Sequence, residues 1–251
     1  MGFVGLEIAP TRVFPEKPYD DLYSAKLWAK RIKSDYELEI SSMQSIWYGK
    51  SERIFGSKKE RVALIDYTKK AVDFAETIGC KNLVFGCPRN RYLLDGIMVE
   101  DSVSFFKEIG NYAFAHKSVI AMEANPPIYN TNFINTTEQA LEFIKMVDSN
   151  GFLLNLDVGT MIANGESVST LKDNEKYIHH VHISEPGLKP IEKRKLHDEL
   201  ADFLRGFGYD GFISVEVGKQ ESVNELKKMM EYVKECFLGM FEFNGDMSRT
   251  V

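Results

Sequence analysis

The sequence predicts an α/β fold, a TIM (β/α) barrel of parallel strands with covering helices. Short β-rich runs alternate with stretches of helical periodicity along the chain, and successive strands start about 27 to 46 residues apart, the length of a βα unit. Runs such as NLVFG and FLLNL are apolar on both faces, which is typical of parallel strands covered by helices. A doubly wound open sheet is also compatible with this alternation, but seven units are closer to a barrel, which has eight.

The expected strands are short runs rich in β-branched and large apolar residues. They cover residues 5–9, 37–41, 82–86, 119–123, 152–157, 179–184 and 212–217. The first strand begins only four residues into the chain. Either one strand escapes the pattern or an opening βα unit is absent.

Between the strands, apolar residues recur with helical spacing. In residues 62–78, Leu64, Ala71 and Phe74 belong to one stripe, and Thr136 with Gln139 predicts a capped start for residues 137–147. The other expected helices cover residues 22–32, 103–114, 167–177, 196–207 and 223–237. No linker or shift in composition divides the chain, so we expect one barrel domain over residues 1–240 and a C-terminal tail over 241–251.

Composition excludes several classes of protein. Apolar residues make up 44% and charged residues 27%, the proportions of a globular protein. The formal net charge is −6, which argues against a nucleic-acid partner bound by a broad basic face. No long apolar run predicts a membrane span, no signal peptide is recognisable, and three cysteines are too few for a disulfide framework. We therefore expect a cytoplasmic protein that binds neither nucleic acid nor membrane.

Four consecutive strands end in a side chain that can bind a metal ion. Glu123 ends VIAME, Asp157 ends FLLNLD, His182 lies in HHVHIS and Glu216 lies in FISVEV. The carboxyl ends of parallel strands meet at one edge of a sheet or barrel, where active sites are built. We therefore expect three carboxylates and one imidazole at the same rim.

Three carboxylates in one cleft repel one another and resist loss of water, so the cluster favours a bound cation. A set of three oxygens and one nitrogen suits one divalent ion, Mn²⁺ first, with Mg²⁺ and Co²⁺ as alternatives and Zn²⁺ less favoured without thiolates. The structural alternative is that each acid caps a helix or pairs with a lysine. That alternative explains any one of the four residues better than it explains all four.

The segments AMEAN, LLNLDVG, HHVHISE and GYDGFISVEV, with ligand spacings of 34, 25 and 34 residues, resemble the xylose isomerase-like TIM barrel superfamily, in its sugar phosphate isomerase/epimerase branch. The resemblance extends from GLEIAPT to the last helix. It implies that Glu123, Asp157, His182 and Glu216 hold one divalent ion at the barrel mouth. It also places GLEIA on the second of eight strands, so the missing unit would be the first.

The resemblance further implies an enzyme, a metal-dependent isomerase or epimerase of a small sugar, keto-sugar or sugar phosphate. In that branch a proton next to a metal-bound carbonyl is abstracted, and Glu123 and Glu216 match the acid/base pair. A dehydratase of a keto-inositol-type substrate would use the same enolisation. The expected partner is a small carbohydrate, and a homo-oligomer is one way to cover the open barrel edge.

Two further function classes stay open. A catalytically degenerate sugar-binding barrel is favoured by the missing strand, which would leave an unpaired edge beside Glu216. An apurinic endonuclease-like phosphodiesterase would need extra histidines for several zinc ions, and Thr160 stands where the family often has one of them. Tyr129 stands where sugar epimerases often carry a second glutamate, so the substrate can differ from theirs.

Five further residues near the rim are candidate substrate contacts. Arginines could clamp a phosphate or carboxylate, an aromatic ring can pack on a sugar, and each also has an ordinary structural reading as a loop ion pair, a helix-start histidine or a packed side chain. The candidates are Arg89, Arg91, His197, Trp47 and Glu7.

Overall fold

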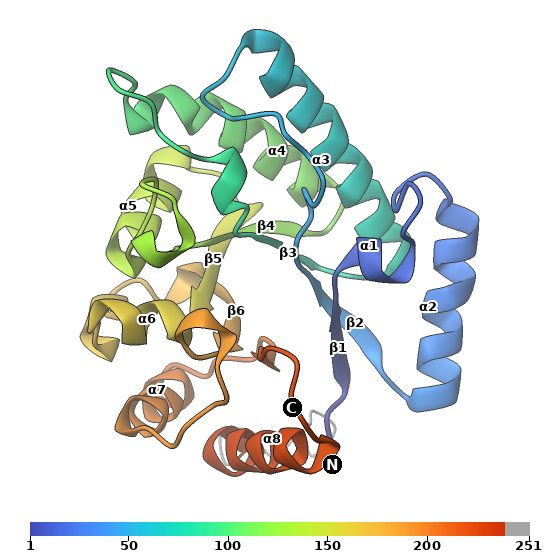
Figure 1. The fold of residues 1–251 in the computed structure, drawn as a ribbon, viewed down its shortest axis with the longest axis vertical. Coiled ribbons are helices and arrows are strands. Elements are labelled where there is room, and N and C mark those ends of the chain that lie inside the picture. Colours follow the sequence, from blue (N-terminus) through green and yellow to red (C-terminus); the bar gives the residue numbers. More distant parts are fainter. Residues whose placement is uncertain (239–251) are drawn as a thin grey trace.

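The core of the molecule is a sheet of seven parallel strands hydrogen-bonded in sequence order, in a computed structural model that describes residues 1–238. The sheet curls into a nearly closed barrel with the helices outside (Figure 1). The strands are β1 Gly5–Ile8, β2 Glu39–Met43, β3 Asn82–Phe85, β4 Val119–Glu123, β5 Phe152–Asp157, β6 Ile178–Ile183 and β7 Ile213–Val215. The predicted barrel is confirmed, and β1 and β7 are its edge strands, unpaired with each other among the described residues.

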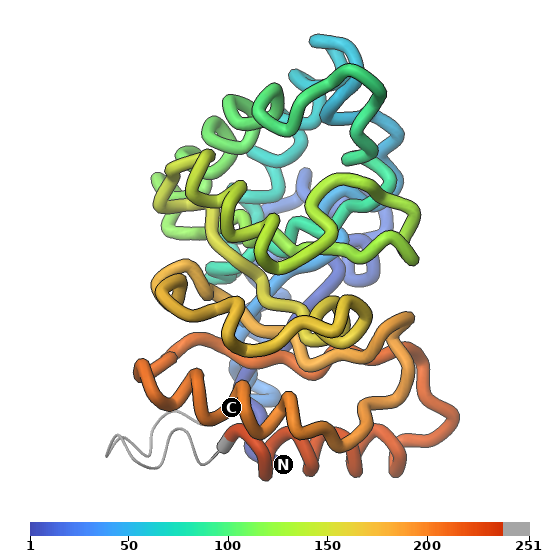
Figure 2. The backbone as a smooth tube through the Cα atoms, turned by 90° about the vertical axis from the view of Figure 1, so that its left-hand side faces the viewer, coloured from blue at the N-terminus to red at the C-terminus, as the bar shows by residue number. Residues whose placement is uncertain are grey.

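Eight α-helices follow the strands among the described residues. They are α1 Pro10–Val13, α2 Leu22–Tyr36, α3 Lys58–Ile78, α4 Val103–Ala115, α5 Thr137–Val147, α6 Val158–Asn164, α7 Lys195–Gly206 and α8 Val223–Leu238. The α5 helix has the predicted start, because Thr136 and Gln139 form a reciprocal capping box. The start of the chain lies beside α8, so the two ends of the curled sheet approach each other (Figures 1 and 2).

The helix expected over residues 167–177 is wrong. The helix of this unit is α6, which begins directly after β5 and ends at Gly165, whose φ of 65° lies in the left-handed region. The following chain forms two 3₁₀ turns, Val168–Leu171 and Glu175–Tyr177. Val168 and Tyr177 pack against the core from these turns, so their apolar spacing came from burial and not from a helix.

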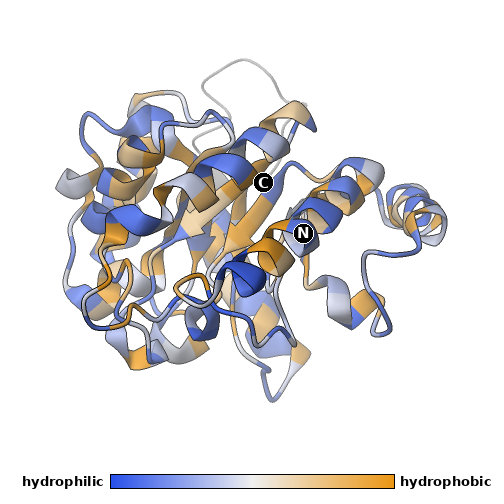
Figure 3. Cartoon of the chain, turned by 90° about the horizontal axis from the view of Figure 1, so that it is seen from above, coloured by the Kyte–Doolittle hydropathy of each residue, from blue (hydrophilic) through white to orange (hydrophobic). Residues whose placement is uncertain are grey.

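Apolar side chains fill the space between the strands and the helices. The strands are largely hydrophobic and the outer faces of the helices largely hydrophilic (Figure 3). Trp47, Phe85 and Phe106 are fully or nearly fully buried and meet edge to face, with ring centroids 4.8 and 5.0 Å apart. This packing supports the loops after β2 and β3 from the side of the core. No helix in residues 1–238 combines the length and apolar character needed to cross a membrane. The tail expected over 241–251 lies outside the described residues.

Candidate metal centre and substrate cavity

The four strand-end residues converge as the sequence predicts. One ligand atom from each of Glu123, Asp157, His182 and Glu216 lies within 4.8 Å of the others. Glu123, Asp157 and His182 come from β4, β5 and β6, and Glu216 directly follows β7. Adjacent strands are parallel, with Glu123 opposite Asn155 and Asp157 opposite His182, so the strand ends bring these side chains to one rim.

His182 presents one ring nitrogen to the carboxylates. Its Nδ1 lies 3.1 Å from Glu123 Oε1 and 3.4 Å from Glu216 Oε2, and the side chain is fully buried. Asn155 Nδ2 also lies 3.2 Å from this nitrogen. Nδ1 is therefore the atom of His182 that belongs to the cluster.

Neighbouring polar groups hold the carboxylates in place. Asn155 donates to Glu123 Oε1 at 2.9 Å, and Asn125 donates to Glu123 Oε2 at 3.1 Å. Asp157 is also the N-cap of α6, where its Oδ2 accepts hydrogen bonds from the Thr160 amide at 2.7 Å and hydroxyl at 2.8 Å. Ser184 donates its hydroxyl to Asp157 Oδ1. These donors fix the orientation of the oxygens while leaving lone pairs for an ion.

The electrostatics of the cluster favour a cation. Burial, followed by the charges of Glu123 and Glu216, raises the pKa of Asp157 to about 7. Burial alone would lower the pKa of His182, but the charges of Glu7 and Glu216 and hydrogen bonds to Glu123 outweigh burial and raise that pKa. No lysine or arginine within residues 1–238 forms an ion pair with these carboxylates. Three acids and one imidazole, without a basic partner, are a donor set that suits a divalent ion.

Two glycines leave room for the carboxylates. A Cβ at Gly86 would lie 2.8 Å from Glu123 Oε2. A Cβ at Gly159 would lie 2.5 Å from Ser184 Oγ and 3.3 Å from Asp157 Oδ2. A Cβ at either position would push these polar side-chain atoms aside, so glycine lets them keep their present places beside the cluster.

The cluster forms one wall of a cavity of about 830 Å³. Glu123, Asp157 and Glu216 line it together with the loops after β2 and β3. Lys50 and Arg89 belong to those loops. The cavity has the size of a small-molecule site and combines three acidic groups with two basic ones.

The remaining predicted site residues divide into two groups. Arg89 and Trp47 line the cavity, although the Trp47 ring is nearly buried and donates to Thr68 Oγ1 at 2.8 Å. Arg91 and His197 are fully buried and do not line it. Arg91 donates to the Glu123 backbone carbonyl at 2.9 Å, and burial lowers its pKa to about 10.

His197 and Glu7 are held by other partners. His197 Nδ1 lies 2.9 Å from the Tyr232 hydroxyl of α8, and Glu7 Oε2 lies 2.8 Å from His182 Nε2. Neither residue lines the cavity. The structure therefore brings the four predicted ligands together, and three of them, Glu123, Asp157 and Glu216, line the cavity with two of the five predicted contacts.

Sequence reasoning missed the polar residues that support the ligands, although a simple signal marks them. Residues two positions apart on a strand share a face. Asn155 precedes Asp157 by two, Asn125 follows Glu123 by two, and Ser184 follows His182 by two. A search for polar residues at these offsets would have found them.

Comparisons with known proteins agree with this fold. The family described as xylose isomerase-like TIM barrel matches residues 1–236. D-psicose 3-epimerase from Clostridium cellulolyticum H10 is 14% identical, with a TM-score of 0.74, over 94% of this chain and 90% of that chain. The IOLI protein with a bound zinc atom is 20% identical, with a TM-score of 0.68, over 95% and 88%.

An AP endonuclease of family 2 from Brucella melitensis is 19% identical, with a TM-score of 0.70, over 92% of this chain and 89% of that chain. A search of curated proteins gave no match. At these identities the solved structures establish a shared fold.

Proposed function

Because the chain belongs to the xylose isomerase-like TIM barrel family, we propose that it is a divalent-metal-dependent isomerase or epimerase of a small sugar, keto-sugar or sugar phosphate. The observation that carries the proposal is the convergence of Glu123, Asp157, His182 and Glu216, of which the three carboxylates line a ligand-sized cavity. The similarity in fold to a sugar epimerase supports the same class of reaction.

The four side chains would hold one divalent ion, Mn²⁺ first, with Mg²⁺, Co²⁺ or Zn²⁺ as alternatives. When bound, the ion would supply Lewis-acid polarisation of a substrate carbonyl. Asp157, fixed by Thr160 and Ser184, would serve as a ligand alone, since its hydrogen bonds hold it in one orientation.

Glu123 and Glu216 would move the proton. Glu123 ends β4 and Glu216 follows β7, so the two carboxylates reach the cavity from strands separated by β5 and β6. One glutamate would remove the proton next to the carbonyl and the other would return it from the opposite face, which inverts the carbon. Return of the proton to the neighbouring carbon would give aldose–ketose isomerisation.

Arg89 and Trp47 are the substrate contacts we favour, together with Lys50. Arg89 is exposed on the cavity loop, and Lys50 Nζ lies on the same side of the cavity, 3.5 Å from Glu52 Oε1. These cations would take a phosphate or carboxylate at the end of the substrate away from the acidic cluster. Arg91 and His197 are not in this set, because neither side chain lines the cavity.

The test combines metal content with solvent exchange. We expect about one equivalent of divalent metal per chain by elemental mass spectrometry, and incorporation of deuterium into a ketose or ketose phosphate in D₂O. Glu216→Gln should lower the exchange rate by about a hundredfold or more, since it removes a base with little change in volume. Glu142→Gln on the exposed face of α5 is the matched control and should exchange at the wild-type rate.

Undiminished exchange in Glu216→Gln would remove this residue from the mechanism. Metal binding without exchange on any carbonyl sugar would point instead to a sugar-binding barrel without activity, and elimination of water from a keto-inositol would point to a dehydratase. Cleavage of abasic DNA would indicate a phosphodiesterase. That last outcome is disfavoured because the cluster of Glu123, Asp157, His182 and Glu216 contains a single histidine.

A further inference from the structure

The second nitrogen of His182 has a partner outside the metal cluster. Its Nε2 lies 2.8 Å from Glu7 Oε2, while Nδ1 faces Glu123 and Glu216 on the other edge of the ring. Glu7 comes from β1 and His182 from β6, so this contact crosses the barrel interior between residues 175 positions apart. The imidazole ring is thus held from both sides.

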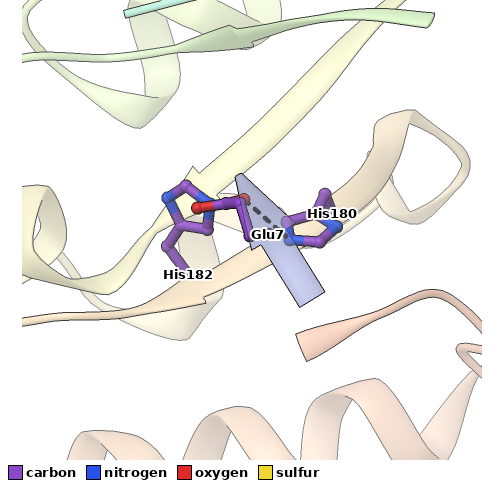
Figure 4. Close-up of side chains that lie close together, drawn as sticks. All are labelled: Glu7, His180 and His182. Carbon is purple, nitrogen blue, oxygen red and sulfur yellow. Dashed lines mark hydrogen bonds and ion pairs between the residues drawn. The ribbon is translucent and has the colours of Figure 1, made fainter. Parts of the chain in front are cut away.

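Glu7 is itself fixed by further contacts. Its Oε1 accepts a hydrogen bond from Gln44 Nε2 at 2.9 Å, and its side chain is only 9% exposed. Gln44 lines the substrate cavity, whereas Glu7 does not. The Glu7 carboxylate lies between the rings of His182 and His180, as Figure 4 shows. Because Gln44 holds Oε1, the other oxygen of the Glu7 carboxylate, Oε2, is fixed in place to accept a hydrogen bond from His182 Nε2.

Glu7, His180 and His182 are close enough to be considered as a second metal site, but hydrogen bonds already occupy them. His180 Nε2 lies 2.8 Å from Ser214 Oγ and 3.6 Å from Glu7 Oε2, and His182 Nε2 is bonded to Glu7. None of the three lines the cavity. The arrangement is that of a hydrogen-bonded support for a ligand.

We propose that Glu7 is a positioning residue that accepts the Nε2 proton of His182 and thereby keeps Nδ1 directed at the metal cluster, where its lone pair would be offered to a bound ion. A neutral imidazole has one protonated and one unprotonated nitrogen, and the hydrogen bond made by one nitrogen decides which is free to bind a metal. A carboxylate behind a histidine ligand also raises its donor strength. This inference rests on the proposed function only in taking His182 as a metal ligand.

The test uses the metal alone as the probe. Zn²⁺ and Mn²⁺ affinities are measured by competition titration for the full chain and for Glu7→Gln, which keeps the shape but loses the charged acceptor. We expect Glu7→Gln to bind about 10- to 100-fold more weakly. Gln44→Ala should weaken binding in the same direction by a smaller factor. Glu108→Gln, which alters an exposed carboxylate of α4 that pairs with Lys69 of α3, is the matched control and should bind as the wild type does.

Nitrogen-15 NMR of histidine-labelled, Zn²⁺-loaded protein reports which ring nitrogen of His182 binds the metal and which carries the proton. A general loss of stability would not change this assignment. We expect His182 to be zinc-bound at Nδ1 and protonated at Nε2 in the wild type. In Glu7→Gln the Nε2 proton should exchange faster with solvent. If Glu7→Gln does not fold, Gln44→Ala carries both measurements.

The outcomes separate this inference from the proposed function. Unchanged affinity in a folded Glu7→Gln, coordination through Nε2, or two equivalents of metal per chain would each overturn the role of Glu7 while leaving the proton-transfer proposal standing. If Glu7→Gln binds metal more weakly and the wild type exchanges no substrate proton, the first result would support the role of Glu7 and the second would contradict the enzyme proposal. A wild-type chain that binds no divalent metal would overturn both.

Discussion

A methyl group added at Gly86 would meet the Glu123 carboxylate, since a Cβ there would lie 2.8 Å from Oε2. The contact is with the far end of a side chain, so we expect Glu123 to move and the fold to survive. Gly86→Ala should therefore weaken divalent-metal binding by about tenfold, the size of effect seen when a ligand loses its support. Metal titration and thermal unfolding of the metal-free protein measure the two quantities separately.

Gly206→Ala is the matched control for that change, because a Cβ at Gly206 would meet nothing within 4 Å. It should leave metal affinity unchanged. Equal affinity in Gly86→Ala and the wild type would show that the Glu123 carboxylate is not held against this glycine.

Thr160 stands where the family often has a histidine, and here it orients the Asp157 carboxylate. Its hydroxyl lies 2.8 Å from both Asp157 Oδ2 and the Ala124 carbonyl, so it ties the end of β5 to the loop after β4. A histidine here would be a further metal ligand, whereas the threonine orients an existing one. The residue type therefore favours a single-ion centre over a cluster of several ions.

At the scale of elements, Asn90 joins the two loops that form the basic side of the cavity. It is buried, and its Nδ2 donates to the backbone carbonyls of Lys50 at 3.1 Å and Glu52 at 2.8 Å. Its own carbonyl accepts from the Ile54 amide at 2.9 Å. Asn90 therefore links the loop after β2, which contains Lys50, to the turn after β3, which contains Arg89.

Asn90→Ala should therefore destabilise the protein without affecting the metal centre. Loss of bonds to buried backbone groups costs about 1–3 kcal/mol of unfolding free energy. Urea unfolding measures that loss. The Mn²⁺ affinity of Asn90→Ala should stay within about twofold of the wild-type affinity, whereas about 1.4 kcal/mol lost at the metal centre would lower it tenfold. Asn132→Ala, at an exposed asparagine that bridges to Leu93, should cost less. A metal affinity that falls together with stability would contradict this separation of the two sides of the cavity.

At the scale of the whole molecule, the acidic cluster couples stability to pH. Asp157 has a usual pKa of 3.8, which the folded, metal-free protein raises to about 7, first through burial and then through the charges of Glu123 and Glu216. Between these two pH values the folded state binds more protons than the unfolded state. The stability that protonated Asp157 contributes is therefore complete below about pH 4 and is lost as the pH rises through 7.

Asp157→Asn should remove this dependence. In the presence of a chelator, the melting temperature of the wild type should fall relative to that of Asp157→Asn between pH 5 and pH 8. Added metal should stabilise the wild type more at pH 8 than at pH 5, because protons compete for the ligands. Parallel melting curves for the two proteins across this pH range would contradict the raised pKa.

The sequence by itself determined the barrel and the four candidate ligands. Parallel strands are read directly from short runs that are apolar on both faces, and the carboxyl ends of such strands meet at one edge whatever the details of packing. Glu123, Asp157 and His182 were therefore placed together without coordinates. The start of α5 could also be predicted from local sequence, since the side chains of Thr136 and Gln139 each accept a hydrogen bond from the other's backbone amide.

Only the tertiary structure decided the orientation of side chains and the contacts between distant segments. Arg89 and Arg91 differ by two positions, yet the 3₁₀ turn Pro88–Asn90 leaves the first exposed and the second fully buried. The helix expected over 167–177 failed because burial alone produced its apolar spacing. The bond between Glu7 and His182 joins residues 175 apart and depends on how the curled sheet brings β1 opposite β6, which no local pattern encodes.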